Sequence, residues 1–328
     1  MKIIRSSMVS IAILTMLMGV MGFASPSTAG EIEAASASQK SVLVTGASSG
    51  IGLKITEVLA ERGVHVWAGA RKEADLKMLD AMENVTAIRL DVTAQKEIDA
   101  AVTRISKDER GLYGLVNNAG VAILAPLIEV EESELDFIFD VNIYGPYRVT
   151  KAFAPLIIES KGRITTISSI SGILSGTLFG PYSMTKHAME AYGDSLAREM
   201  GKFDVKVSLV EPGNYKSKIG QSLKKRMESK GITYEDSLYK DEIEAIVSSV
   251  GERSDEKDPE EVAEAVYQAL FSDNPKMRYM VVPDQEEAGW TIGKAIQELV
   301  QLNEGQPYAY DRDTLVKMLD EALTALEE

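Results

Sequence analysis

Residues 41–52, with the sequence SVLVTGASSGIG, decide the fold of this 328-residue chain. The first five are a short, β-branched run typical of a buried strand, and an amphipathic helical pattern follows the last. Glycines between a strand and a helix let the backbone turn tightly and approach a pyrophosphate, which the N–H groups at the helix start then face. A merely structural turn is the alternative. The strand and helix around the glycines favour a dinucleotide site formed by Gly46, Ser48, Ser49, Gly50, Ile51 and Gly52.

The same alternation of β-branched runs and amphipathic stretches continues along the chain, which is typical of βαβ units. We expect strands at 41–46, 64–70, 85–90, 113–117, 162–168, 204–210 and 278–282. Each of the first six leads into a helical pattern. The predicted fold class is therefore α/β, a Rossmann-type doubly wound parallel sheet of about seven strands with helices on both faces. Residues 40–328 are predicted to form one domain.

A charged, partly amphipathic segment near 216–258 interrupts this rhythm before the last strand. Insertions in such sheets lie at the carboxyl ends of the strands, where ligands bind, so the segment is a candidate lid. A solvated surface excursion is the alternative.

Composition excludes several classes of function. The formal net charge of −15 offers phosphate backbones no attraction, so no nucleic-acid binding is expected. The chain has no cysteine and two histidines, so no metal site is expected either.

The first 39 residues differ from the rest. Lys2 and Arg5 precede an apolar run from Met8 to Ala24, and a small-residue stretch follows. This layout predicts a signal peptide or membrane anchor plus a flexible tail, and hence membrane association or export. One alternative is that the segment is a buried N-terminal helix. The other is that the enzyme is cytoplasmic, because NADP(H) is a cytoplasmic cofactor.

The end of the second predicted strand bears on the choice of cofactor. An acidic residue there would bond the ribose hydroxyls of NAD, but this chain has Ala70 and Arg71. The planar guanidinium of Arg71 can pair with a 2′-phosphate, so NADP(H) is expected and NAD(H) is less favoured. The alternative is an exposed arginine neutralised by Glu73 and Asp75.

A candidate catalytic group follows the fifth predicted strand. Tyr182 and Lys186 are four residues apart and share one face of a helix. A nearby ammonium favours the phenolate, so Lys186 is expected to lower the pKa of Tyr182, which would act as general acid and base. Ser169, with Ser168 and Ser171 as rivals, could hold the substrate oxygen.

Asn142 lies on the otherwise apolar helical stripe Leu135, Ile138, Phe139 and Asn142. An inward polar group must find partners. A satisfied core amide without a role in turnover is one interpretation.

These motifs together resemble the short-chain dehydrogenase/reductase family over about residues 40–285. The glycine spacing, Tyr182 and Lys186 match its cofactor and catalytic motifs, and the spacing from Tyr182 favours Ser169 as its serine. The resemblance implies that Asn142 holds a water linked to Lys186 in a proton relay. It also implies that Lys186 and Tyr182 contact the cofactor, together with Asp91, Val92, Asn118, Ala119, Gly120, Pro212, Gly213 and Ser217. Ser217 stands where the family usually has threonine.

The activity that this resemblance implies is hydride transfer between an alcohol and a ketone or aldehyde. Ile173, Leu174, Leu178 and Phe179 precede Tyr182 and indicate an apolar small-molecule substrate, as in the similar retinol and hydroxysteroid dehydrogenases. The family also implies a homo-oligomer. A noncatalytic NADP-binding sensor or scaffold is the alternative. An epimerase or dehydratase of the family's longer branch is disfavoured, because the glycine motif of that branch is spaced Gly-xx-Gly-xx-Gly.

Overall fold

The computed structural model describes residues 39–249 and 256–326, and its centre is one parallel sheet. The seven strands run in the order β3-β2-β1-β4-β5-β6-β7. They are β1 (Ser41–Val44), β2 (His65–Ala70), β3 (Val85–Arg89), β4 (Gly114–Asn117), β5 (Arg163–Ile167), β6 (Lys206–Pro212) and β7 (Arg278–Val281). The predicted fold class and strand positions are confirmed.

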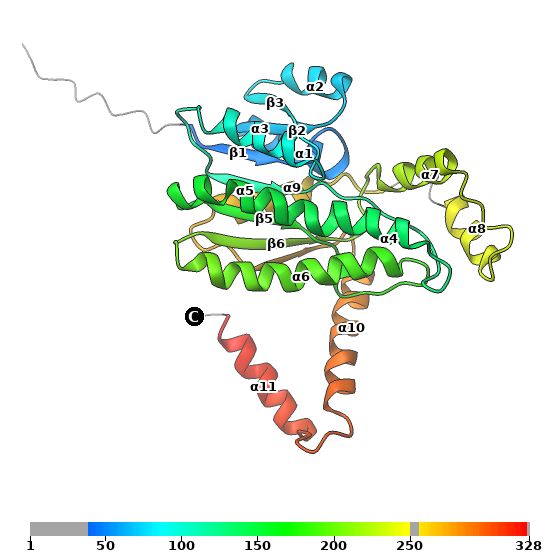
Figure 1. The fold of residues 1–328 in the computed structure, drawn as a ribbon. Coiled ribbons are helices and arrows are strands. Elements are labelled where there is room, and N and C mark those ends of the chain that lie inside the picture. The colour runs from blue at the N-terminus through cyan, green and yellow to red at the C-terminus, as the bar shows by residue number, and fades with distance from the viewer. Residues whose placement is uncertain (1–38, 250–255, 327–328) are drawn as a thin grey trace, which may run out of the picture. The chain divides into compact units, whose positions relative to one another are not determined.

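Helices cover both faces of this sheet, as the strand-helix rhythm predicts. They are α1 (Gly50–Glu61), α2 (Glu73–Asp80), α3 (Gln95–Ile105), α4 (Glu132–Phe139), the π-helix η1 (Asp140–Tyr144), α5 (Gly145–Glu159), the 3-10 turn η2 (Ile170–Gly172), α6 (Gly180–Gly201), α7 (Ile219–Lys230), α8 (Lys240–Ser249), α9 (Glu260–Phe271), α10 (Gln285–Asn303) and α11 (Arg312–Thr324). Figure 1 shows α5 and α6 lying across the near face.

The two halves of the core follow from the alternation of side chains along β1. Val42 and Val44 point to one face and pack in a cluster with residues of α1, α2 and α9. Leu43 points to the other face and packs in a cluster with α3 and α5, where Phe153 is fully buried. Both faces of the sheet are therefore shielded from water, which explains why the sequences of the central strands are nearly continuous apolar runs.

The strand register brings four loops to one edge of the sheet. Val44 of β1 is paired with Val116 of β4, and Asn117 with Thr166 of β5. Ile167 of β5 is paired in turn with β6. Because parallel strands end at the same edge, the turns after β1, β4, β5 and β6 meet there, and a ligand site is expected at this edge.

The segment predicted as a candidate lid contains α7 and α8. Leu223 of α7 and Ile243 of α8 pack with Leu124, which follows β4, and with Leu178, which precedes α6. The amphipathic character of the segment thus comes from apolar residues that cover the loops at the carboxyl edge. Its residues 250–255 lie outside the described part of the chain.

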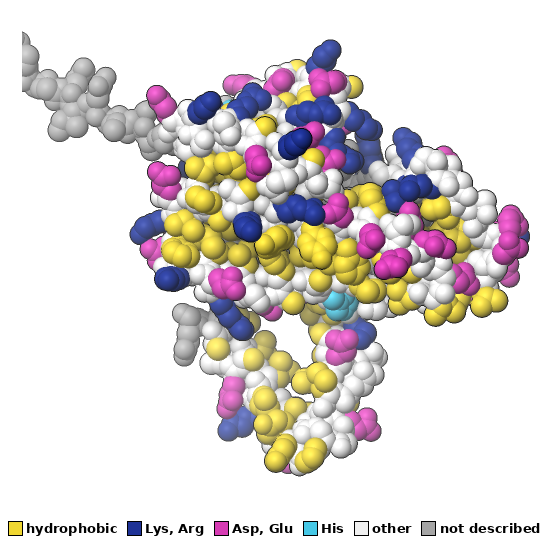
Figure 2. Space-filling view, viewed as in Figure 1, with side chains coloured by type: hydrophobic (Ala, Val, Ile, Leu, Met, Phe, Trp, Pro, Cys, Tyr) yellow, Lys and Arg dark blue, Asp and Glu magenta, His cyan; other side chains and the backbone are white. Residues whose placement is uncertain are grey.

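The C-terminal helices leave many apolar side chains exposed. None of the residues of α11 is buried, and Leu319 and Leu323 are more than half exposed, as is Ile296 of α10. Figure 2 shows hydrophobic side chains gathered on α10 and α11 and over α5. Within residues 39–249 and 256–326, no helix combines the length and hydropathy needed to cross a bilayer. The N-terminal segment 1–39 falls almost entirely outside the described residues, so the signal or anchor stays a prediction.

Candidate active site

The glycine turn after β1 is built around positions that admit no side chain. Gly46 and Gly50 have positive φ angles of 65° and 54°, which favour glycine. A Cβ on Gly52 would overlap the backbone oxygen of Gly46 and Nδ2 of Asn118. Ser49 is the N-cap of α1 and makes no side-chain capping bond. The first N–H groups of a helix have no intrahelical partner, so they and the half-buried Ser49 hydroxyl can face an anion.

Residues from two other loops complete this turn. Asn118 donates from Nδ2 to the carbonyl of Thr45 over 2.9 Å, and the N–H of Ala119 donates to Thr45 Oγ1 over 3.1 Å. Ser217, in the loop after β6, lies against Gly50, where a Cβ would be 3.3 Å from the Ser217 Cα. The structure therefore gathers the predicted glycine turn, the turn after β4 and Ser217 into one cradle.

The groups predicted at the adenosine end lie at the ends of β2 and β3. Nη1 of Arg71 is 3.5 Å from Oδ2 of Asp91, and the Arg71 side chain is 64% exposed. Burial opposes ionisation of Asp91, but hydrogen bonds from Thr93 and the charge of Arg71 lower its pKa overall. Val92 is buried in the core and packs against Gly145. Arg71 is thus held by one weak contact and is available to a further anion.

Tyr182, Ser169 and Lys186 meet at the carboxyl edge of β5. The Ser169 hydroxyl lies beside the Tyr182 phenol, close enough to lower its pKa. Lys186 is buried, donates from Nζ to the carbonyl of Ile167 over 2.9 Å, and lies 5.6 Å from the centre of the Tyr182 ring. Ser169 Oγ also lies 3.4 Å from the carbonyl of Pro212, which ties the serine to the turn after β6. Three segments distant in sequence therefore converge on one phenol.

Burial governs the protonation of this pair. Burial raises the pKa of Tyr182 to about 12, although the hydrogen bond from Ser169 opposes the rise. Burial also lowers the pKa of Lys186 to about 8. The net shift of the Tyr182 pKa is upward because desolvation of the phenol dominates, and the expected lowering by Lys186 stays a prediction. At neutral pH the phenol therefore keeps its proton.

Asn142 occupies η1 and is 3% exposed. Its Oδ1 accepts from the N–H of Val121 over 2.9 Å, and its Nδ2 donates to the Val121 carbonyl and to Thr185 Oγ1 over 2.9 and 3.1 Å. A Cβ on Gly120 would lie 3.5 Å from the Oδ1 of Asn142. The amide thus ties the turn after β4 to α6 beside Lys186, and the water relay stays a prediction.

Sequence reasoning missed Glu287, which holds the turn after β6. Its carboxylate is buried in the first turn of α10 and accepts from the backbone N–H and the Nδ2 of Asn214 over 2.9 and 2.8 Å. A side chain on Gly213 would overlap it. Polar side chains at helix starts are common in sequences, so nothing local distinguishes Glu287 from its exposed neighbour Glu286.

Comparison with known proteins identifies the family. The sequence profile described as short chain dehydrogenase matches residues 40–228. The chain belongs to the short-chain dehydrogenase family. This short-chain dehydrogenase is 33% identical over 250 residues to an uncharacterized oxidoreductase, YbbO, of Escherichia coli K12, with 74% of this chain and 86% of the relative covered. It is 36% identical over 251 residues to the NADPH-dependent 3-dehydrocapnine reductase of Ornithobacterium rhinotracheale, with 74% and 87% covered.

Solved structures agree with this membership. A short-chain dehydrogenase from Streptomyces avermitilis is 30% identical, with a TM-score of 0.70 and coverage of 82% of this chain and 96% of that one. The structure of ElxO with NADP bound is 25% identical, with a TM-score of 0.61 and coverage of 76% and 99%. A Burkholderia phymatum enzyme in complex with NAD, at 22% identity and a TM-score of 0.69, shares the fold.

In this short-chain dehydrogenase, a cavity of about 560 Å³ lies between the segment after β4 and α7. Ile123, Leu124, Leu223 and Met227 line its apolar part, whereas the segment before Tyr182 does not contribute. Ile123 also belongs to the apolar cluster against which Tyr182 packs, so the cavity adjoins the surroundings of Tyr182 through Ile123.

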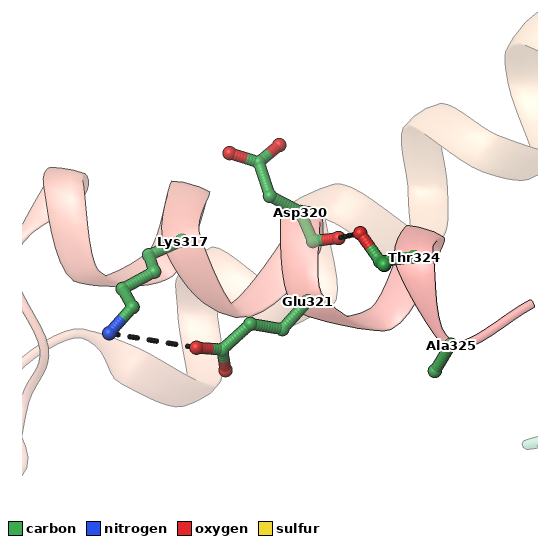
Figure 3. A pocket seen from close by; sticks show the side chains of 5 residues that line it. All are labelled: Lys317, Asp320, Glu321, Thr324 and Ala325. Atoms are coloured by element: carbon green, nitrogen blue, oxygen red, sulfur yellow. Dashed lines mark hydrogen bonds and ion pairs between the residues drawn. The ribbon is translucent and has the colours of Figure 1, made fainter. Parts of the chain in front are cut away.

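A second hollow, on the surface of α11, is of a different kind. It is lined by four residues of α11 and by Ala325, which follows the helix. Figure 3 shows Lys317 and Glu321 turned toward one another, and their Nζ and Oε1 atoms are 3.6 Å apart. The Thr324 hydroxyl donates to the carbonyl of Asp320 over 2.9 Å. These groups are paired along one exposed helix, so this hollow offers no catalytic arrangement.

Proposed function

We propose that this protein is an NADP(H)-dependent oxidoreductase that interconverts an alcohol and a ketone or aldehyde, with Tyr182 as general acid and base. The convergence of Tyr182, Ser169 and Lys186 carries the proposal, because the Ser169 hydroxyl lies beside the phenol and the ammonium lies 5.6 Å from its ring. A scaffold that only binds nucleotide has no need of this arrangement.

The protonation of the site suits reduction of a carbonyl. Bound nicotinamide nucleotide supplies or accepts the hydride. Tyr182 carries its proton at neutral pH, since burial raises its pKa to about 12, and so can donate that proton to an alkoxide oxygen. Ser169 holds the same oxygen from a second side and stabilises its developing charge. In the oxidising direction Tyr182 must lose the proton, and the Lys186 ammonium then stabilises the phenolate.

The choice of NADP(H) rests on Arg71 and its surroundings. Its guanidinium is 64% exposed and makes a 3.5 Å contact with Asp91, an exposed pair of the kind that contributes little. A 2′-phosphate at this place would accept two charge-assisted hydrogen bonds from the Arg71 guanidinium, and no strong interaction would have to be broken. The NADPH-dependent 3-dehydrocapnine reductase and the NADP-bound ElxO support the proposal by similarity.

The substrate is an apolar small molecule that extends from Tyr182 along Ile123 into the cavity beneath α7. Arg226 of α7 donates from Nε and Nη2 to the Glu134 carboxylate of α4 over 2.8 and 2.7 Å, which closes one side of this space. We therefore propose that α7 is the moving part of the predicted lid and that the Arg226–Glu134 ion pair holds it closed against α4.

Two further properties are proposed from the sequence and the family. The chain forms a homo-oligomer, which the exposed aromatic rings of Tyr144 and Tyr147 over α5 support, and sedimentation analysis tests it. The segment 1–39 directs the chain to or across a membrane, and mass spectrometry of the mature amino terminus tests this.

The deciding experiment compares cofactor binding with turnover. NADPH binding is followed by fluorescence, and turnover is measured on a broad panel of ketones and aldehydes. The Tyr182→Phe variant should bind NADPH normally and lose ~10²- to 10⁴-fold in rate. Tyr192→Phe removes a hydroxyl from the same helix and should keep its rate. Tight NADPH binding by the unmodified protein without turnover of any carbonyl would instead favour the sensor or scaffold.

A further inference from the structure

Behind Lys186, on the side away from Tyr182, lie two carboxyl groups that the reaction as described does not use. Glu190 is one helical turn after Lys186 on α6, and Glu211 immediately precedes Pro212 on β6. Their side chains are 13% and 3% exposed. Acidic residues are seldom buried to this extent unless they are paired, so their partners decide their state.

One guanidinium serves both carboxyl groups. Nε of Arg278, at the start of β7, is 3.0 Å from Oε2 of Glu190 and 3.3 Å from Oε1 of Glu211. Arg278 also binds Asp194 through Nη2 over 2.8 Å, at a position where the Asp194 side chain is 44% exposed. Three acids therefore share one positive charge, which leaves the two buried ones short of compensation.

The hydrogen bonding of the buried pair is incomplete among the described residues. Oε1 of Glu190 and Oε1 of Glu211 have no hydrogen-bond partner among the described residues. Gly172 closes the space beside Glu190, because a Cβ there would lie within 3.0 Å of its side chain. The buried hydroxyl of Ser168 is also without a partner in this part of the chain. Two buried carboxyl groups that meet at one guanidinium nitrogen can be reconciled by a proton between them.

The pair also acts on the catalytic lysine. Burial lowers the pKa of Lys186, and the charge of Glu190 is the opposing influence that raises it. The structure thus links the charge of the carboxyl pair to the fraction of Lys186 that is an ammonium.

We propose that Glu190 and Glu211 share one proton and are positioning residues that hold the positive charge of Lys186 in alkaline solution. This rests on the proposed function, since Lys186 matters there as the cation that stabilises the Tyr182 phenolate. The pair releases its shared proton to water as the pH rises, and its charge changes from −1 to −2.

The pH range of that release falls where Lys186 needs support. Burial and the neighbouring Glu190 raise the pKa of Glu211 to about 8, against the opposing charge of Arg278 and with a further rise from Asp194. Burial lowers the pKa of Lys186 to about 8 even against the raising charge of Glu190, so the ammonium is lost in the same range. The second negative charge therefore appears as the ammonium would otherwise be lost.

The first test is the pH profile of kcat for alcohol oxidation. Glu190→Gln removes the charge without changing the shape, and its alkaline limb should move to lower pH by roughly one unit. Glu190→Asp keeps the charge and should keep most of the limb. Glu199→Gln removes an exposed charge from the same helix, away from Arg278, and serves as the matched control, with an unmoved limb. A limb unmoved in Glu190→Gln would overturn the proposal.

The second test needs no turnover, so it separates failure of this proposal from failure of the proposed function. The infrared spectrum of the protein at pH about 7 should contain a protonated carboxyl band that disappears on titration through pH about 8. The band should be missing in Glu211→Gln and present in Glu199→Gln. Absence of a protonated carboxyl band from the unmodified protein at neutral pH would refute the shared proton, whatever substrates the enzyme accepts.

Discussion

Gly52→Ala adds only one methyl group, but it should damage the cofactor cradle severely. The added Cβ would lie within 3.0 Å of the Gly46 carbonyl oxygen and of Asn118 Nδ2. Backbone cannot yield as a flexible side chain does, so the turn must open. Nδ2 of Asn118 then loses its bonds to the carbonyls of Thr45 and Gly46, now 2.9 and 3.2 Å long.

The magnitude follows from those contacts. Each lost hydrogen bond is worth ~0.5 to 1.5 kcal/mol, and overpacking adds ~1 to 3 kcal/mol. We expect the free energy of unfolding to fall by about 2 to 6 kcal/mol. The N–H groups at the start of α1 move with the turn, so the Kd for NADPH should rise at least ~10-fold, which is about 1.4 kcal/mol.

Urea denaturation and fluorescence titration with NADPH measure these two quantities. Gly289→Ala is the matched control, because no atom lies within 4 Å of its added Cβ on α10. That variant should keep its NADPH affinity and gain ~0.5 to 1 kcal/mol in stability from the lost flexibility of the unfolded chain. If Gly52→Ala bound NADPH as tightly as the unmodified protein, the glycine would not be required by the cradle.

Three further predictions concern other parts of the molecule. Changing Arg71 to serine should weaken NADPH binding by roughly 10- to 100-fold relative to NADH, as measured by fluorescence titration, and an unchanged ratio would place the 2′-phosphate elsewhere. Glu287→Gln replaces an acceptor oxygen with an amide donor facing Asn214, so it should raise the KM for cofactor and lower the Tm, whereas exposed Glu286→Gln should do neither. Burial, and then the charge of Arg110, lowers the pKa of His65 to about 4 from 6.5, so the unfolded chain takes up this proton first. The free energy of unfolding should therefore decline as pH falls from about 6.5 to 4, and urea titrations of His65→Gln should show a flatter decline over that range.

The sequence alone predicts which segments form strands, but it predicts their ends less well. All seven expected strands are present, because buried parallel strands read as short β-branched runs whatever their neighbours. Their ends are less exact. The sixth strand was expected to stop at residue 210 and continues to Pro212, since Glu211 and Pro212 are paired with Met280 and Val281 of β7. A strand ends where its partner ends, and the partner is 70 residues away.

The candidate site divides in the same way. The turn of α6 carries Tyr182 and Lys186 on one face, as their spacing predicts, and the glycine turn lies between strand and helix as expected. The raised pKa of Tyr182 was not predictable from residue spacing, because desolvation depends on everything packed around the phenol.

The sequence by itself determined the order of strands and helices, the glycine cradle and the catalytic spacing, since all of these are local patterns of one or two helical turns or a single strand. Only the tertiary structure decided which distant charges meet. Arg278 reaches Glu190 and Glu211 because β7 is paired with β6 beside α6, and Glu287 reaches Asn214 because α10 begins next to the turn after β6. Those contacts depend on strand register and helix placement across the whole sheet, and they set the charge and rigidity of groups whose identities the sequence already contained.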